Sequence, residues 1–169
     1  QKGVDDLLKI WLEVVRQKPS ARLAFIGWGH PGQKENFIEE IKKEGLDKNI
    51  EFLGFRDGAE KYKVIKSSKL LLFPSKYESF GIVVLESLAA GVPVVAYDLA
   101  VLRENFNGGP VYVPLGKREE FAQKVLDLLE DSSARALMVK QGQSLAAKFD
   151  WRGLGIDTFN YINNLCQSL

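Results

Sequence analysis

The chain is poor in the features that mark secreted, membrane-spanning and zinc-binding proteins. It has one cysteine, Cys166, and one histidine, His30, among its 169 residues. A single cysteine excludes an internal disulfide, and the Cys and His spacings of zinc sites are absent. No apolar run is long enough to span a bilayer, and the first residues do not resemble a signal peptide. These absences favour a reducing, cytoplasmic environment.

The chain also lacks an excess of charge of either sign. It has 23 Lys and Arg against 22 Asp and Glu, a formal net charge of +1. This balance gives no support for a nucleic-acid-binding field or a polybasic membrane surface. Hydrophobic residues make up 46% of the chain, as expected for a globular domain with its own core. The chain begins at Gln1, directly ahead of a helix-like segment, so we expect a fragment whose missing part holds half of the site.

Short apolar runs alternate along the chain with longer amphipathic segments. The runs predict strands at residues 22–26, 50–53, 70–73, 93–96 and 111–113. The other segments predict helices at 4–18, 32–44, 57–66 and 80–90, and helical structure after 117 with breaks near 132 and 150. Strands that are apolar throughout and alternate with helices predict a Rossmann-like α/β fold, a doubly wound parallel sheet covered on both faces.

In such sheets, ligands bind beyond the carboxyl ends of the strands. The segments to inspect are therefore 27–32, 54–58, 74–81 and 97–104. Four lysines lie in or beside the predicted helix 57–66, and with a net charge near zero they are interpreted as a solvated helix face. They are Lys61, Lys63, Lys66 and Lys69.

The segment 74–96 is the most informative, because its helix is apolar nearly all round and therefore predicted to be buried. Glu86 lies in the middle of this helix, where a carboxylate needs a partner or a cleft. Glu78 comes eight residues earlier, roughly 12 Å along a helix axis, too far for a shared proton. The pair suits an extended ligand with a polar group at each end. Between them, the backbone N–H groups of Ser79, Phe80 and Gly81 suit a phosphate or a sugar hydroxyl.

Glu78 and Glu86 form an E-x7-E motif, and their surroundings resemble the retaining glycosyltransferases of family 4, which have the GT-B fold. The resemblance extends through the run from Pro74 to Ala96 and covers nearly the whole chain. Lys2-Gly3 looks like the family's K-G turn, Gly27-Trp28-Gly29 its G-x-G loop, and the segment 52–55 its base-side loop. An isolated E-x7-E is weak evidence, but the same motif inside this ordered series is strong.

The resemblance implies that the chain is the C-terminal, nucleotide-sugar-binding domain of such an enzyme. It implies that Glu78 is the catalytic residue facing the donor sugar, that Glu86 holds the ribose hydroxyls, and that Lys2 pairs with the diphosphate. The implied donor-binding residues are Lys2, Gly27, Gly29, Phe55, Arg56, Ser79, Phe80, Gly81 and Glu86, with Asp57 beside the base. No metal and no cofactor are implied, because helix dipoles and basic side chains replace the cation. The partner is the protein's own N-terminal acceptor domain, towards which residues 151–169 would cross.

The chain also departs from the family pattern. Ser79 replaces the glycine of the usual E-G-F-G, and the usual G-G-x-P-E run reads Ala100-Val101-Leu102-Arg103-Glu104. Three other functions are weighed: a non-catalytic nucleotide-binding scaffold, a GT-B sugar-nucleotide epimerase, and a NAD-binding domain. The last lacks its G-x-G-x-x-G turn. The base, the sugar (hexosyl, with mannosyl and glucosyl in view), the acceptor, the oligomeric state and membrane association of the full-length enzyme stay open.

Overall fold

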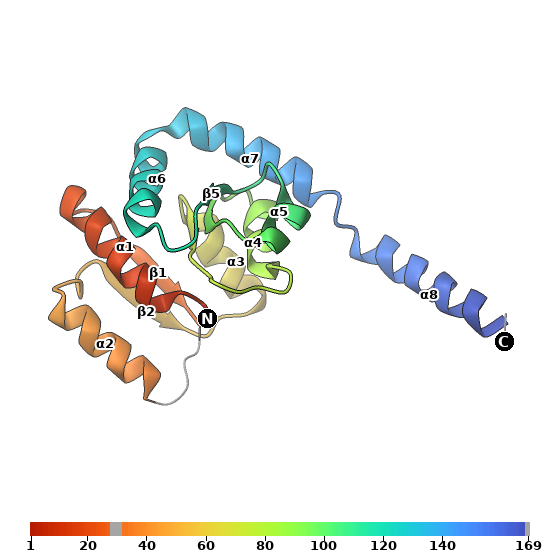
Figure 1. Ribbon diagram of the computed structural model, residues 1–169, viewed down its shortest axis with the longest axis horizontal. Coiled ribbons are helices and arrows are strands. Elements are labelled where there is room, and N and C mark those ends of the chain that lie inside the picture. The colour runs from red at the N-terminus through yellow and green to blue at the C-terminus, as the bar shows by residue number, and fades with distance from the viewer. Residues whose placement is uncertain (28–31, 168–169) are drawn as a thin grey trace.

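The computed structural model describes residues 1–27 and 32–167 and shows strands alternating with helices (Figure 1). The strands are β1 (Leu23–Ile26), β2 (Ile50–Gly54), β3 (Leu71–Phe73), β4 (Val94–Tyr97) and β5 (Val111–Val113). The helices are α1 (Val4–Gln17), α2 (Gln33–Lys43), α3 (Gly58–Ser67), α4 (Ile82–Ala89), α5 (Ala100–Phe106), α6 (Arg118–Glu130), α7 (Ser132–Ala146) and α8 (Trp151–Gln167).

All the strand pairs are parallel, so the predicted fold class is confirmed. The hydrogen-bonded strands form two groups, β1-β2 and β3-β4-β5. Strand β4 shows why both faces of the sheet must be covered, because its side chains alternate between two cores. Val95 and Tyr97 pack in the core that α1 and α6 cover, whereas Val94 and Ala96 pack in the core that α4 and α5 cover.

The predicted start of one helix near the site was wrong. Helix α4 begins at Ile82 rather than at residue 80, because Gly81 has a left-handed conformation with φ 90°. The helix is buried only in part: Ile82 and Val83 are exposed, while Val84, Leu85, Ser87 and Leu88 are buried. The first turn of α4 therefore exposes two apolar side chains.

Residues 100–104 after the fourth predicted strand were interpreted as a loop, but Ala100–Phe106 form helix α5. Leu102 and Phe106 are both fully buried, and their spacing of four residues places them on one helical face. This face packs directly against Gly81, whose added Cβ would meet Leu102 Cδ2 at 2.5 Å. Helix α5 thereby closes one side of the turn that precedes α4.

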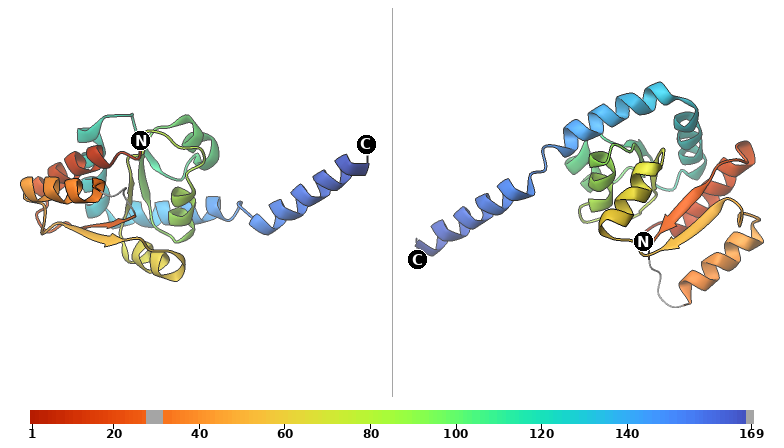
Figure 2. Two further views of the ribbon diagram at one scale, coloured as in Figure 1. Left: turned by 90° about the horizontal axis from the view of Figure 1, so that it is seen from below. Right: turned by 180° about the vertical axis from the view of Figure 1, so that it is seen from behind.

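Helix α8 extends away from the rest of the molecule (Figures 1 and 2). It has no buried residue, although it carries large apolar side chains. The exposed ones are Trp151, Leu154, Ile156, Phe159, Tyr161, Ile162 and Leu165. Within the residues that the structure describes, no helix combines the length and apolar character needed to cross a membrane.

Candidate functional site

The start of the chain packs against the loop that follows β3. Gly3 precedes α1 with φ 71°, and an added Cβ would lie 1.8 Å from the backbone oxygen of Pro74. Only glycine permits this approach, since other L-residues have a Cβ and rarely adopt this φ. The backbone N–H of Lys76 donates to the oxygen of Gln1 at 2.9 Å. The K-G turn is therefore held beside the segment that carries the first motif glutamate.

This packing brings Lys2 to Glu78. Lys2 Nζ lies 2.6 Å from Glu78 Oε1, and Ser75 Oγ donates to the same oxygen at 2.8 Å. The Glu78 side chain is 8% exposed, whereas that of Lys2 is 68% exposed. Burying a polar group is costly unless it is hydrogen-bonded, and these two donors meet that need. The structure thus joins two residues that the motif interpretation had assigned to neighbouring parts of one ligand.

In the turn between Glu78 and α4, the side chain of Phe80 is packed and that of its neighbour Ser79 is exposed. The Phe80 ring packs edge-on against Phe106 and Phe149, with centroids 5.5 and 6.0 Å apart, while Ser79 is exposed. Phe80 therefore anchors the turn through its side chain. The N–H groups at the start of α4 carry the positive end of the helix dipole.

Glu86 lies in the second turn of α4 and faces α3. Lys61 Nζ is 2.6 Å from Glu86 Oε1, and the Tyr62 hydroxyl donates to the same oxygen at 3.3 Å. The side chains of Lys61 and Glu86 are 27% and 16% exposed. The interpretation of Lys61 as part of a solvated helix face was therefore wrong. Sequence reasoning missed this residue, since helical spacing alone does not show which lysine turns inward.

The other carboxylate oxygen of Glu86 is exceptional. Oε2 is covered, and none of the described residues donates a hydrogen bond to it. A buried acceptor without a donor is energetically costly, and such groups are rare in proteins. This oxygen is chemically suited to accept from a hydroxyl group.

The carboxyl ends of β1 and β2 lie side by side. The backbone N–H of Gly27 donates to the oxygen of Gly54 at 3.1 Å, which joins the ends of the two strands. Phe55 is 51% exposed, and Arg56 Nη1 donates to the backbone oxygen of Phe55 at 2.9 Å. Asp57 occupies the position before α3, but its side chain makes no capping hydrogen bond. Gly29 and His30 lie outside the described residues.

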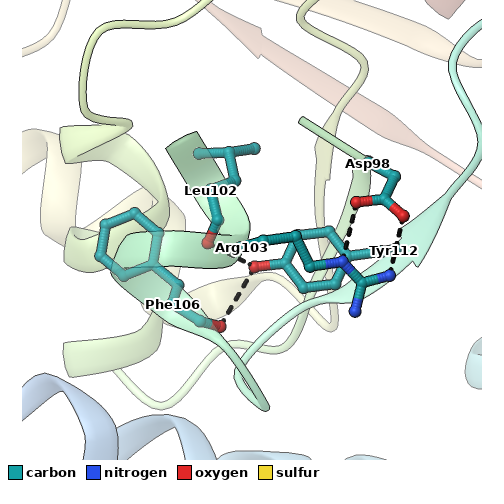
Figure 3. Close-up of polar contacts among 5 residues, drawn as sticks. All are labelled: Asp98, Leu102, Arg103, Phe106 and Tyr112. Atoms are coloured by element: carbon teal, nitrogen blue, oxygen red, sulfur yellow. Dashed lines mark hydrogen bonds and ion pairs between the residues drawn. The ribbon is translucent and has the colours of Figure 1, made fainter. Parts of the chain in front are cut away.

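Three side chains contact one another beside α5 (Figure 3). They are Asp98 after β4, Arg103 on α5 and Tyr112 on β5, and we call this group the clamp. Arg103 donates to both carboxylate oxygens of Asp98, at 2.7 and 2.8 Å, and its guanidinium lies 4.2 Å from the centre of the Tyr112 ring. The hydrogen bond from Arg103 lowers the pKa of Asp98, and burial raises the pKa of Tyr112 to about 12. Glu104 is exposed. Arg103 lies in the run 100–104 that departs from the family pattern.

A buried carboxylate on α1 ties four elements together. Asp6 is 6% exposed and accepts from the Tyr97 hydroxyl at 3.0 Å. Lys76 Nζ lies 3.1 Å from one Asp6 oxygen and Arg118 Nη1 lies 3.7 Å from the other. Burial, and then the hydrogen bond to Asp6, raise the pKa of Tyr97. The sequence suggested only an acid in a first helical turn, so this connection of α1 to the sheet edge was missed.

The motif residues thus gather at one edge of the sheet, at the end of β3 and the start of α4. Within residues 1–27 and 32–167, no cluster of three or more His, Cys, Asp or Glu side chains could hold a metal ion. This edge offers the Lys2–Glu78, Lys61–Glu86 and Lys76–Asp6 pairs and the N-terminus of α4.

A family model, described as glycosyl transferases group 1, matches residues 1–145. The chain belongs to this family, and its fold is that of the Rossmann-like C-terminal domains of GT-B glycosyltransferases. The resemblance to this family that the sequence indicated is therefore confirmed.

Three of the similar proteins match over most of this chain but less than half of their own length. The phosphatidyl-myo-inositol mannosyltransferase of Mycobacterium leprae is 32% identical over 154 residues, 89% of this chain and 40% of the relative. The sucrose-phosphate synthase of Thermosynechococcus elongatus has a TM-score of 0.88 at 21% identity, over 100% of this chain and 43% of its own. HepE of Anabaena, in complex with UDP and glucose, has a TM-score of 0.81 at 24% identity, over 99% and 45%.

Proposed function

We propose that the chain binds a nucleoside-diphosphate sugar and forms the donor half of a retaining hexosyltransferase. The observation that carries the proposal is the Lys2–Glu78 pair, 2.6 Å apart although separated by 76 residues in sequence. It places the ammonium of an exposed lysine and an enclosed carboxylate together near the start of α4. Family membership and the UDP complex of a structurally similar protein support this choice of ligand.

In this proposal Glu86 binds the ribose, and Glu78 faces the transferred sugar. As the sugar leaves, negative charge develops on the nucleoside diphosphate. Lys2 and the N-terminus of α4 stabilise that charge, because preorganised donors are most effective where charge develops. Lys2 is 68% exposed and can turn from Glu78 to the ligand. The base would contact Phe55 and Arg56, and no metal is required.

The chain spans 40% of the mannosyltransferase that it resembles. We therefore propose that the acceptor groups lie in a separate N-terminal domain and that the 169 residues alone are inactive. Helix α8 would bury its apolar side chains against that domain. Most helix stability in proteins comes from tertiary packing, and α8 has no buried residue. The sugar in this proposal is a hexose, with mannose and glucose as the first candidates.

Calorimetric titration of the purified full-length protein with UDP, GDP and ADP tests donor binding. We expect one diphosphate to bind selectively and Glu86→Ala to weaken it by about tenfold or more, the effect of losing a hydrogen bond to a charged group. Glu39→Ala on α2, an exposed acid away from this edge, is the control. Absence of binding by the folded wild-type protein refutes the proposal.

Sugar transfer is tested with the full-length enzyme by measuring turnover and the anomeric configuration of the product. We expect retention at the anomeric carbon, and a loss of turnover in Glu78→Gln. An inverted product, or unchanged turnover in Glu78→Gln, would contradict the assignment. The 169-residue chain alone is expected to bind the diphosphate more weakly and to transfer no sugar.

A further inference from the structure

The Glu86 carboxylate has an asymmetric environment that the E-x7-E motif does not explain. Both of its described donors, Lys61 and Tyr62, point to Oε1 from adjacent positions on α3. Oε2 has no donor among the described residues and is covered. A carboxylate can accept about four hydrogen bonds, so two donors on one oxygen fix the group without exhausting it.

Lys61 is itself held in position. Its ammonium lies 2.6 Å from Glu86 Oε1 and 5.2 Å from the centre of the Tyr62 ring. Its side chain is 27% exposed, whereas Lys63 on the same helix is 72% exposed and pairs with its helical neighbour Glu60 at 2.6 Å. The two lysines have the same chemistry, and only Lys61 joins α3 to α4.

We infer that Lys61 is a positioning residue, which turns the Glu86 carboxylate so that Oε2 accepts from a ribose hydroxyl of the donor nucleotide. The inference rests on the proposed function, because the nucleoside diphosphate is its ligand. Lys61 occupies one oxygen and leaves the other as the acceptor. Tyr62 provides the second, longer contact and a smaller share of the same effect.

The prediction concerns selectivity for the ribose hydroxyls rather than affinity alone. The probes are the best-bound diphosphate among UDP, GDP and ADP, and its 2′,3′-dideoxy form, each titrated into the full-length protein. A hydrogen bond to a charged group corresponds to a preference of about 10- to 100-fold for the ribose form. Lys61→Met keeps much of the side-chain length and removes the ammonium. We expect it to lower this preference at least about fivefold, towards that of Glu86→Ala.

Three further variants separate positioning from a general structural effect. Lys61→Arg restores a cation and is expected to recover part of the preference. Tyr62→Phe is expected to lower it less than Lys61→Met does. Lys63→Met, the matched control on the same helix, is expected to leave it unchanged. Melting of each variant without ligand shows whether the fold is retained.

The outcomes distinguish this inference from the proposed function. If Lys61→Met weakens the ribose and dideoxy forms equally, or changes neither, Lys61 does not position Glu86 and the inference is overturned, while a selective loss in Glu86→Ala leaves the proposed function standing. If the wild-type protein binds no diphosphate, both are overturned. A loss of selectivity confined to the Lys61, Tyr62 and Glu86 variants supports the inference.

Discussion

Replacing Gly3 by alanine tests whether the start of the chain is locked against the β3 loop. An added Cβ would lie 1.8 Å from the Pro74 oxygen and 2.6 Å from the Pro74 carbonyl carbon. These are backbone atoms, which cannot rotate away as the end of a side chain can. Pro74 follows β3 directly and is buried, and α1 is held by its own buried face. The clash must therefore be relieved by displacing one of these segments.

The chain contains a closely matched control. Gly45, just past α2, has the same φ of 71°, but an added Cβ there would meet nothing within 4 Å. Both substitutions cost about 1–2 kcal/mol for alanine in a left-handed conformation. Only Gly3→Ala adds overpacking, typically about 1–3 kcal/mol. The difference between the two variants corresponds to about 2–12 °C in melting temperature for a domain of this size.

Urea denaturation and thermal melting of both variants measure this difference. We expect Gly3→Ala to be the less stable by about 1–3 kcal/mol. It should also weaken nucleoside-diphosphate binding, because Lys2 moves with the turn, whereas Gly45→Ala should not. Equal stability of the two variants, with unchanged binding, would refute the reasoning that the K-G turn is sterically locked against Pro74.

Two further predictions concern the clamp beside α5. The Tyr112 hydroxyl donates to the backbone oxygens of Leu102 and Phe106 at 2.7 and 3.1 Å, so Tyr112→Phe should cost about 0.5–1.5 kcal/mol in urea denaturation. An unchanged midpoint would show that these bonds contribute nothing net. The hydrogen bond from Arg103 lowers the pKa of Asp98, so the folded protein favours the charged carboxylate. This stabilisation is fully present above the ordinary pKa of about 3.9, and it is lost as the pH falls through the lower pKa that Asp98 has in the folded protein. Asp98→Asn should therefore be less stable than wild type by up to about 1 kcal/mol at pH 7, with the difference shrinking near pH 3; a constant difference would contradict the pair.

The fold was predictable because its signals are local. The apolar run that predicts β4 reports burial on both sheet faces, as the alternation of Val94 to Tyr97 between two cores shows. Helix α5 was missed because it has only seven residues, and two buried side chains four apart give too short a pattern to recognise. The start of α4 was misplaced because the conformation of Gly81 is set by its packing against α5.

The site was predictable only in part, because its contacts join residues far apart in sequence. Topology places Lys2 and Glu78 at the same sheet edge, but the 2.6 Å pair follows from the close approach of Gly3 to Pro74. The Lys61–Glu86 pair depends on the rotation of α3 about its axis, which periodicity does not fix for a helix with lysines on several sides. The roles of all these residues towards a ligand stay predictions.

Each motif glutamate is paired with a lysine from another element, and the two pairs differ in a way that suits different tasks. Both carboxylates are largely enclosed, and each accepts a hydrogen bond from a lysine. The lysine that pairs with Glu78 is 68% exposed, whereas the lysine that pairs with Glu86 is 27% exposed and lies between α3 and α4. An exposed lysine is readily exchanged to another anion, while an enclosed one is held in its pair. In the proposed function, Lys2 shifts from Glu78 to the diphosphate while Lys61 stays on Glu86, and the difference in exposure suits these two tasks.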